Sequence, residues 1–178
     1  MGIEMWAAVL GVAVIFPSVF VYNRLLAAYK LAREAHADID VQLRRRAELV
    51  PPLVEAVRAH APQQTVLLGA VSGMRSAALA AQPSAERFAA ERALGAGLKQ
   101  VLGLQERYPQ LKADAAFLDL QRRLAEVEDQ LQYAQRSYNG AVKQYALRLE
   151  SFPDRLVANL FRFRPMPFFE SDDRRERR

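Results

Sequence analysis

The sequence predicts an all-α protein, in which a single N-terminal transmembrane helix is followed by an up-down helical bundle with two long and two shorter helices. Apolar residues make up 51% of the 178 residues, too many for a disordered chain, and 8 Gly with 9 Pro are too few for a turn-rich all-β protein. Apolar residues also recur at steps of three and four along several long segments, which indicates helices. The chain has no Cys and only 2 His, which excludes disulfide frameworks, cysteine zinc sites and thiol nucleophiles.

The N-terminal segment, residues 1–23, is predicted to be a membrane anchor. Residues 5–23 carry no charged side chain, and as a helix they would extend about 28 Å, close to the ~30 Å hydrocarbon core of a bilayer. A cleaved signal peptide is the alternative, but no Lys or Arg precedes the apolar run and small residues are missing from the cleavage positions. The residues assigned to the anchor are Met5, Trp6, Leu10, Ile15, Phe16, Phe20 and Tyr22, with Trp6 and Tyr22 as the interfacial aromatic residues.

The basic residues beside the anchor predict its orientation. Arg24, Lys30 and Arg33 follow the apolar run closely, whereas only the amino terminus is basic before it. Because basic flanking segments stay in the cytoplasm, we expect the N-terminus outside the cell membrane and the rest of the chain in the cytoplasm.

The helical bundle is predicted to comprise residues 24–153. Its first helix continues from the anchor to about His60, and Pro51-Pro52 either kinks this helix or stops and restarts it. Residues 65–81 predict a second helix, and a third runs from an N-cap at Ser84 to about Tyr108. The apolar stripe of the first helix consists of Leu25, Tyr29, Ala32, His36, Ile39 and Leu43.

The fourth helix has the clearest periodicity in the chain, a heptad seam of about four heptads that is typical of bundles and coiled coils. Phe152-Pro153 ends this helix. Residues 154–170 predict a short amphipathic segment, and residues 171–178 a disordered basic tail. The seam consists of Phe117, Leu120, Leu124, Val127, Leu131, Ala134, Tyr138, Ala141 and Tyr145.

The helix lengths predict an interaction surface. The two long helices have about 40 residues, or ~60 Å, and the two shorter helices can cover only part of them. The uncovered seam, residues 22–39 and 138–149, would bury itself against a second copy of the chain or another membrane protein. Its polar residues either fix register and partner choice or simply face solvent. The candidate interaction residues are Asn23, Tyr29, Ile39, Asp40, Gln42, Arg44, Tyr138 and Asn139.

A second surface is predicted in residues 154–170, where the fourth helix would return the chain to the bilayer. Arginine side chains would meet anionic headgroups while phenylalanine rings enter the interface. The candidate lipid-interface residues are Arg155, Phe161, Arg162, Phe163, Arg164, Phe168 and Phe169.

The arginine run of the first helix has two interpretations. Arg44, Arg45 and Arg46 could bind phosphate or anionic lipid. Ion pairs at a spacing of four, with Asp40 before Arg44 and Glu48 after it, are favoured.

The two histidines are assigned structural roles. His36 is expected to pack in the seam and His60 to lie near a helix end, where a cation is favourable. Four of the arginines behind the net charge of +5 lie in the last five residues, and without them the chain is nearly neutral. No nucleic-acid partner is therefore expected.

The catalytic signatures of common enzyme classes are absent from the sequence. Neither histidine has Glu three residues before it, as di-iron bundles require, and no serine nucleophile elbow, phosphate loop or dinucleotide fingerprint occurs. We therefore expect a protein that is not an enzyme, with no cofactor, no metal and no small-molecule substrate.

The chain resembles the LemA family over residues 22–170. The most specific block is Ile-Asp-Val-Gln-Leu-Arg-Arg-Arg at residues 39–46. Further matches are Tyr22-Asn23, Leu49-Val50-Pro51, Leu53-Val54-Glu55, Tyr108-Pro109, Leu111-Lys112-Ala113, Phe117, Leu120-Gln121, Tyr138-Asn139, Ala141-Val142, Phe152-Pro153 and Phe168-Phe169-Glu170.

The resemblance implies a single-pass protein of the bacterial inner membrane with a short extracytoplasmic N-terminus and a helical-bundle body. Relatives are associated with membrane metalloproteases, with TPM-domain proteins or with internal membranes. The chain departs from the family at His36, where tryptophan is common, and at residues 61–64, which lack a His-Glu pair. The expected function is that of a membrane-anchored scaffold or adaptor that self-associates or binds a membrane protein such as a protease, and a membrane-shaping or anionic-lipid-binding protein is the alternative.

Overall fold

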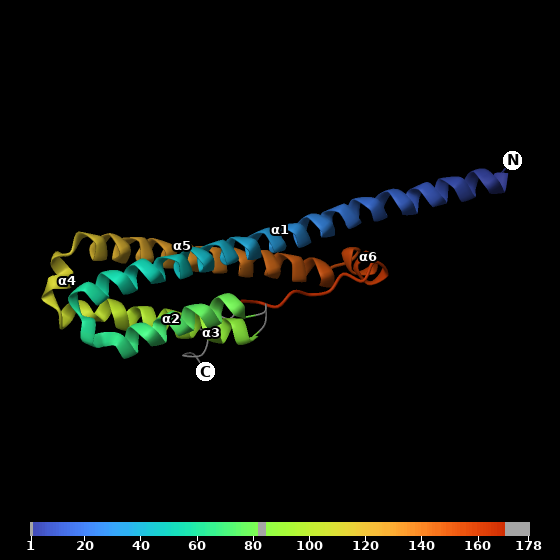
Figure 1. Ribbon diagram of the computed structural model, residues 1–178. Coiled ribbons are helices and arrows are strands. Elements are labelled where there is room, and N and C mark those ends of the chain that lie inside the picture. Colours follow the sequence, from blue (N-terminus) through green and yellow to red (C-terminus); the bar gives the residue numbers. More distant parts are fainter. Residues whose placement is uncertain (1, 82–84, 170–178) are drawn as a thin grey trace, which may run out of the picture. The chain divides into compact units, whose positions relative to one another are not determined.

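The structure is a computed structural model that describes residues 2–81 and 85–169, without the side chains of residues 3–15 and 85. Every described element is helical, which confirms the all-α prediction (Figure 1). α1 and α5 are long and α2 and α3 are shorter, also as predicted. The elements are α1 (Gly2–His60), the 3₁₀ helix η1 (Pro62–Gln64), α2 (Thr65–Ala80), α3 (Ala85–Gly103), the 3₁₀ helix η2 (Leu104–Glu106), α4 (Pro109–Ala113), α5 (Ala115–Glu150) and α6 (Asp154–Leu160).

The chain forms two compact units. Unit 1 contains Met1–Asp38 and Tyr133–Arg178, and unit 2 is the continuous segment Ile39–Gln132. α2 and α3 both belong to unit 2, so they cover only part of the two long helices, as the length argument predicted.

Unit 2 is an up-down bundle whose inner surface is aliphatic. α2 and α3 pack side by side (Figure 1), and Gly97 allows them to approach closely, because a Cβ there would lie 3.0 Å from Val71 Cγ2 and 2.9 Å from Met74 Sδ. Leu53, Leu68, Leu94, Val101, Leu111 and Phe117 are among the side chains that pack in its core and are essentially inaccessible to solvent.

α1 continues through Pro51 and Pro52 without a break. A proline has no N–H to donate to the carbonyl four residues earlier, so Pro51 leaves the buried Ala47 oxygen without its helical donor. Arg75 of α2 replaces that donor, since its Nε donates to Ala47 O at 2.7 Å. The proline thus frees a backbone carbonyl of α1, and a side chain of another helix binds it.

The seam predicted for α5 is confirmed residue by residue. All nine of its side chains are buried, from Phe117 at the first turn to Tyr145 near the last. On α1, the predicted stripe is buried at Leu25, Ala32, Ile39 and Leu43 and half-buried at its other two positions.

α6 and the residues that follow it belong to unit 1. Val157 and Ala158 of α6 pack against Val21 and Leu25 of α1. The helix ends in a Schellman motif, in which Arg162 has a φ of 56° and the Phe163 N–H donates to Ala158 O at 2.9 Å. Residues 163–169 then continue without regular secondary structure (Figure 1, red).

The predicted anchor forms the start of α1. Among the residues that could be searched, no helix has a stretch that is long and apolar enough to cross a membrane. The side chains of Met5, Trp6, Leu10 and Ile15 lie outside the described residues. Phe16 and Phe20 are 77% and 66% exposed.

Candidate functional site

An ion-pair network in unit 2 joins three helices around Arg46. Arg46 Nη2 donates to the carboxylate of Glu91 at 2.6 Å and to the Glu91 carbonyl at 2.9 Å, and Nη1 lies 3.5 Å from Glu128 Oε2. The side chains of Arg46 and Glu91 are only 8% and 10% exposed. Gly95 leaves room for the guanidinium, because a Cβ there would lie 3.3 Å from Nη1. The network fixes α1, α3 and α5 in one register.

These partners differ from the ion pairs predicted within α1. Asp40 pairs with Arg87 of α3, at 2.9 Å between Oδ1 and Nη2, rather than with Arg44. Arg46 likewise pairs with acids on α3 and α5 rather than on its own helix. The partners are 45 residues or more away in sequence, so helical spacing could not reveal them.

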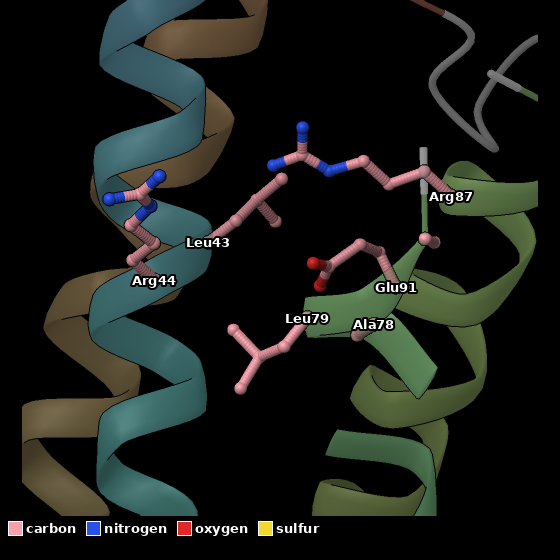
Figure 2. A pocket seen from close by; sticks show the side chains of 7 residues that line it. Leu43, Arg44, Ala78, Leu79, Arg87 and Glu91 are labelled. Carbon is pink, nitrogen blue, oxygen red and sulfur yellow. The ribbon is translucent and has the colours of Figure 1, made fainter. Parts of the chain in front are cut away.

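A small pocket of about 200 Å³ lies beside this network. Figure 2 shows Arg87 extending from α3 toward α1, with the Glu91 carboxylate below it and Arg44 on α1. Arg44 is exposed, whereas the charges of Arg87 and Glu91 are balanced by Asp40 and Arg46. The remaining lining residues are Leu43, Ala78, Leu79 and Ala81.

A second polar cluster fixes the start of α5. Asp114 is the N-cap, and its Oδ1 accepts the Phe117 N–H at 2.7 Å while its Oδ2 lies 2.9 Å from His60 Nε2. The Phe117 N–H, and after it the hydrogen bond with His60, lower the pKa of the Asp114 carboxyl below its ordinary value. His60 ends α1, as predicted, and it links that end to the start of α5.

Residues 61–64, where the chain departs from the family pattern, form the turn between α1 and α2. The side-chain amides of Gln63 and Gln64 both donate to the Tyr108 hydroxyl at 2.9 Å. Ala61 is fully buried. These residues tie the turn to the segment that precedes α4.

In unit 1, residues 164–169 lie along α5, and side chains of α5 form hydrogen bonds with their backbone atoms. The hydroxyls of Tyr138 and Tyr145 donate to the carbonyls of Pro167 and Arg164, at 2.7 and 3.0 Å. Asn139 makes two hydrogen bonds to Phe169, donating to its carbonyl at 3.0 Å and accepting its N–H at 2.8 Å. Three side chains of α5 thus bind the backbone of an extended segment.

Burial accompanies these contacts. Tyr138 is buried, and its desolvation raises the pKa of the hydroxyl. Burial likewise raises the pKa of Tyr145, and the nearby Tyr29 raises it further. Both hydroxyls therefore act as donors at neutral pH.

Aromatic side chains complete the contact between α1 and the C-terminal residues. The Tyr22 ring centroid is 4.8 Å from that of Phe161 and 5.7 Å from that of Phe163. Tyr29 contacts both Phe163 and Tyr145. On the same unit, the His36 ring packs edge-on against Tyr138 at 5.4 Å, which confirms the packing role predicted for this histidine.

The expectation that the seam near Tyr29 and Tyr138 is uncovered is wrong. Residues 161–169 lie on it, so both side chains have partners within the chain itself. Ile39, in unit 2, is 1% exposed, and so it presents no surface to a partner.

The other candidate interaction residues have different environments. Asn23 and Arg44 are exposed, and Asn139 is half-buried under Phe169. The Gln42 side-chain oxygen is buried without a hydrogen-bond donor among the described residues. Binding roles for these residues stay predictions.

The candidate lipid-interface residues divide into two groups. Arg155, Arg162 and Arg164 are exposed, as a headgroup contact requires, and Phe161 and Phe168 are 55% and 43% exposed. Phe163 and Phe169 are half-buried against residues of α1 and α5.

Several exposed apolar residues beside this group were not predicted. Phe152, Leu156 and Leu160 are 83%, 62% and 76% exposed. A spacing of four residues at 156 and 160 is the signal that could have found the two leucines, since it places them on one side of α6, and Phe152 lies before that helix.

No three His, Asp or Glu side chains of the described residues come together in a group that could hold a metal ion. The functional residues that sequence reasoning missed are instead the partners of the polar clusters, namely Glu91, Arg87, Glu128 and Asp114. Only Asp114 carried a local signal, because Asp before the first apolar turn of a helix is a common N-cap.

Comparison with protein-family models identifies the family of this chain. No curated protein matches the chain significantly. The model that describes the LemA family matches residues 35–178, which include all of unit 2. Since this match covers most of the sequence, the chain belongs to the LemA family.

Proposed function

We propose that this protein is a membrane-anchored helical scaffold, held in the bacterial inner membrane by the start of α1, with its N-terminus outside and its helical body in the cytoplasm. The observation that carries the proposal is the exposure of Phe16 and Phe20, 77% and 66%, at the end of an uncharged segment that is continuous with the helix of the body. Large exposed apolar side chains on a helix need an apolar surrounding, and a bilayer supplies it.

The scaffold role rests on exposed apolar side chains of unit 1. Leu31, Tyr133 and Leu147 are 51%, 66% and 55% exposed. A second copy of the chain, or a membrane protein such as a metalloprotease, would cover them. These residues replace Tyr29, Ile39 and Tyr138 as the proposed contact points, because those three are engaged or buried. The proposal includes no catalytic step.

Photo-crosslinking in cells tests the scaffold role. A photo-crosslinking amino acid is introduced singly at Leu31, Tyr133 and Leu147, and adducts are identified by mass spectrometry. Positions Arg122 and Glu126, exposed polar sites of α5 in unit 2, serve as matched controls. Recurring adducts with one membrane protein or with a second copy, at the apolar positions and not at the controls, support the proposal. Equal adducts at all five positions, or none, would contradict it.

Lipid binding is the second candidate function, and exposed residues of α6 favour it. Phe152, Leu156 and Leu160 combine apolar exposure with the exposed arginines at 155 and 162. Deformation or clustering of anionic vesicles by the purified protein would support a membrane-shaping role, and unchanged vesicles would exclude it.

A further inference from the structure

We infer that α6 is a second membrane contact, a short amphipathic helix that lies on the anionic surface of the same bilayer that holds the start of α1. This inference rests on the proposed membrane anchoring and deepens it. The apolar contact is made by Phe152, Leu156, Leu160 and Phe161. The contact with lipid phosphates is made by Arg155 and Arg162.

α6 has two different faces. One face is buried in unit 1, where Val157, Ala158 and the carboxylate-bearing Asp154 are each less than 10% exposed. The other face carries Leu156 and Leu160, 62% and 76% exposed, with Phe152 before the helix and Phe161 after it. In a helix of seven residues, this much exposed apolar surface is unfavourable in water and favours burial against an apolar partner.

The buried face fixes where α6 lies along α1. Val157 and Ala158 pack on Val21 and Leu25, and Phe161 contacts Tyr22. Phe16 and Phe20 lie within about two helical turns before this contact. The exposed apolar side chains of α6 are thus close to the end of the uncharged segment of α1, within one compact unit.

Charge near this surface favours an anionic partner. Arg24, Arg155, Arg162 and Arg164 are all exposed. Of the two acids in the described residues 150–169, Asp154 is buried and Glu150 is exposed. Each cation beside an anionic membrane strengthens its attraction to that surface. Arginine also occupies the left-handed position 162, where glycine would be less strained.

A bilayer fits this surface better than a protein does. A stable protein interface needs about 20–30 residues a side, whereas α6 has seven residues, of which one face is already buried. A bilayer contact needs no such area. The proposed anchor holds α6 beside the bilayer, so the second contact forms at a high effective concentration of lipid.

Fluorescence quenching in vesicles tests the inference. Since the chain has no Cys, the single variants Phe16→Cys, Leu147→Cys and Leu160→Cys each carry one environment-sensitive label on the full chain. The three side chains are 77%, 55% and 76% exposed, so labelling disturbs little packing. The proteins are reconstituted into phosphatidylcholine vesicles, with or without phosphatidylglycerol, that contain lipids with a quencher at a shallow depth of the acyl chain.

The expected result is strong quenching at positions 16 and 160 and several-fold weaker quenching at 147, with the signal at 160 increasing when phosphatidylglycerol is present. The double variant Arg155→Gln/Arg162→Gln should reduce quenching at 160 to its value in phosphatidylcholine alone and leave position 16 unchanged. Circular dichroism of each variant checks that the helices are retained.

The outcomes separate the two claims. Quenching at 16 without quenching at 160 overturns the contact of α6 and leaves the anchor intact. No quenching at 16 overturns the anchor itself. A label at 160 that is shielded from lipid and self-quenches between copies would instead assign this face to a second copy of the chain, and would equally overturn the inference.

Discussion

Arg46 is the residue whose environment most constrains unit 2. Its guanidinium is almost fully removed from water, and the Glu91 carboxylate at 2.6 Å is its main compensation, since Glu128 is farther away and 45% exposed. A buried charge without its partner is far less favourable than the intact pair. Packing of α3 on α1 therefore requires that this pair forms.

Removing the charge of Glu91 should destabilise the protein strongly. We expect Glu91→Gln to lower the free energy of unfolding by about 3 kcal/mol, because the buried Arg46 charge keeps only the more distant Glu128 as an anionic partner, beside its hydrogen bond to the carbonyl of residue 91. Urea denaturation of the full chain in mild detergent, followed by circular dichroism, measures this change.

The matched control is Asp119→Asn, which breaks two exposed pairs with Arg122 and Arg123. Exposed pairs are worth under about 1 kcal/mol, so the control should change little. Equal effects of the two substitutions would mean that the buried pair is not a structural requirement.

Asp114 should make stability depend on pH in the acid range. Its pKa is lowered in the folded chain, so the charged carboxylate stabilises the fold above the ordinary value of 3.8, and this stabilisation is lost as the pH falls through the lowered pKa. Asp114→Asn keeps an acceptor for the Phe117 N–H but not the charge, and its deficit against wild type should shrink as the pH falls below 3.8.

Asp114→Ala is the comparison, since it loses the cap as well as the charge and should stay less stable than Asp114→Asn throughout the range. Thermal unfolding measured at several pH values distinguishes the two variants. A deficit of Asp114→Asn that does not change with pH would show that the cap, and not the charge, is what matters.

At the residue scale, the sequence predicted burial well and polar partners badly. Burial follows from helical periodicity, so the seam from Phe117 to Tyr145 could be predicted correctly. Asp40 was expected to pair with Arg44, but its partner Arg87 comes from another helix. Periodicity carries no information on which helix faces a given charge.

At the scale of elements, α1 illustrates how a helix tolerates proline. The Ala47 carbonyl, freed by Pro51, is bound by Arg75 of α2. From the sequence, a kink and a restart were both open, because the donor that compensates the proline lies 28 residues from its acceptor.

A double-mutant cycle on Pro51 and Arg75 tests this compensation. Arg75→Ala alone should lower stability by about 1–3 kcal/mol, since the buried Ala47 carbonyl is left without a donor. In the Pro51→Ala background the new N–H of residue 51 binds that carbonyl, and the effect of Arg75→Ala should fall to a few tenths of a kcal/mol. Additive effects in the cycle would contradict the account.

The path of residues 163–169 could not be predicted from the sequence. Their contacts are made largely by backbone carbonyls, to the hydroxyls of Tyr138 and Tyr145 and to the Asn139 amide. Backbone acceptors are present at every residue, so no pattern in the sequence distinguishes them. The amphipathic character of α6 was predicted, whereas the burial of Phe163 was not.

At the scale of the whole molecule, the two units have different chemistry. Unit 2 is a largely aliphatic bundle whose buried charges, Arg46 and Glu91, pair with each other. Unit 1 combines aromatic packing with exposed apolar residues at 16 and 20 of α1 and at 156 and 160 of α6. These exposed apolar residues of unit 1 are the ones that the proposed membrane anchoring would cover.

Alkaline carbonate extraction of membranes from cells that produce the full chain tests the central claim most directly. We expect the protein to stay in the membrane pellet, and a variant with Val12→Glu and Val14→Glu in the uncharged segment to move to the supernatant while keeping its helical content. Complete extraction of the unmodified chain, or equal retention of the variant, would contradict anchoring by the start of α1.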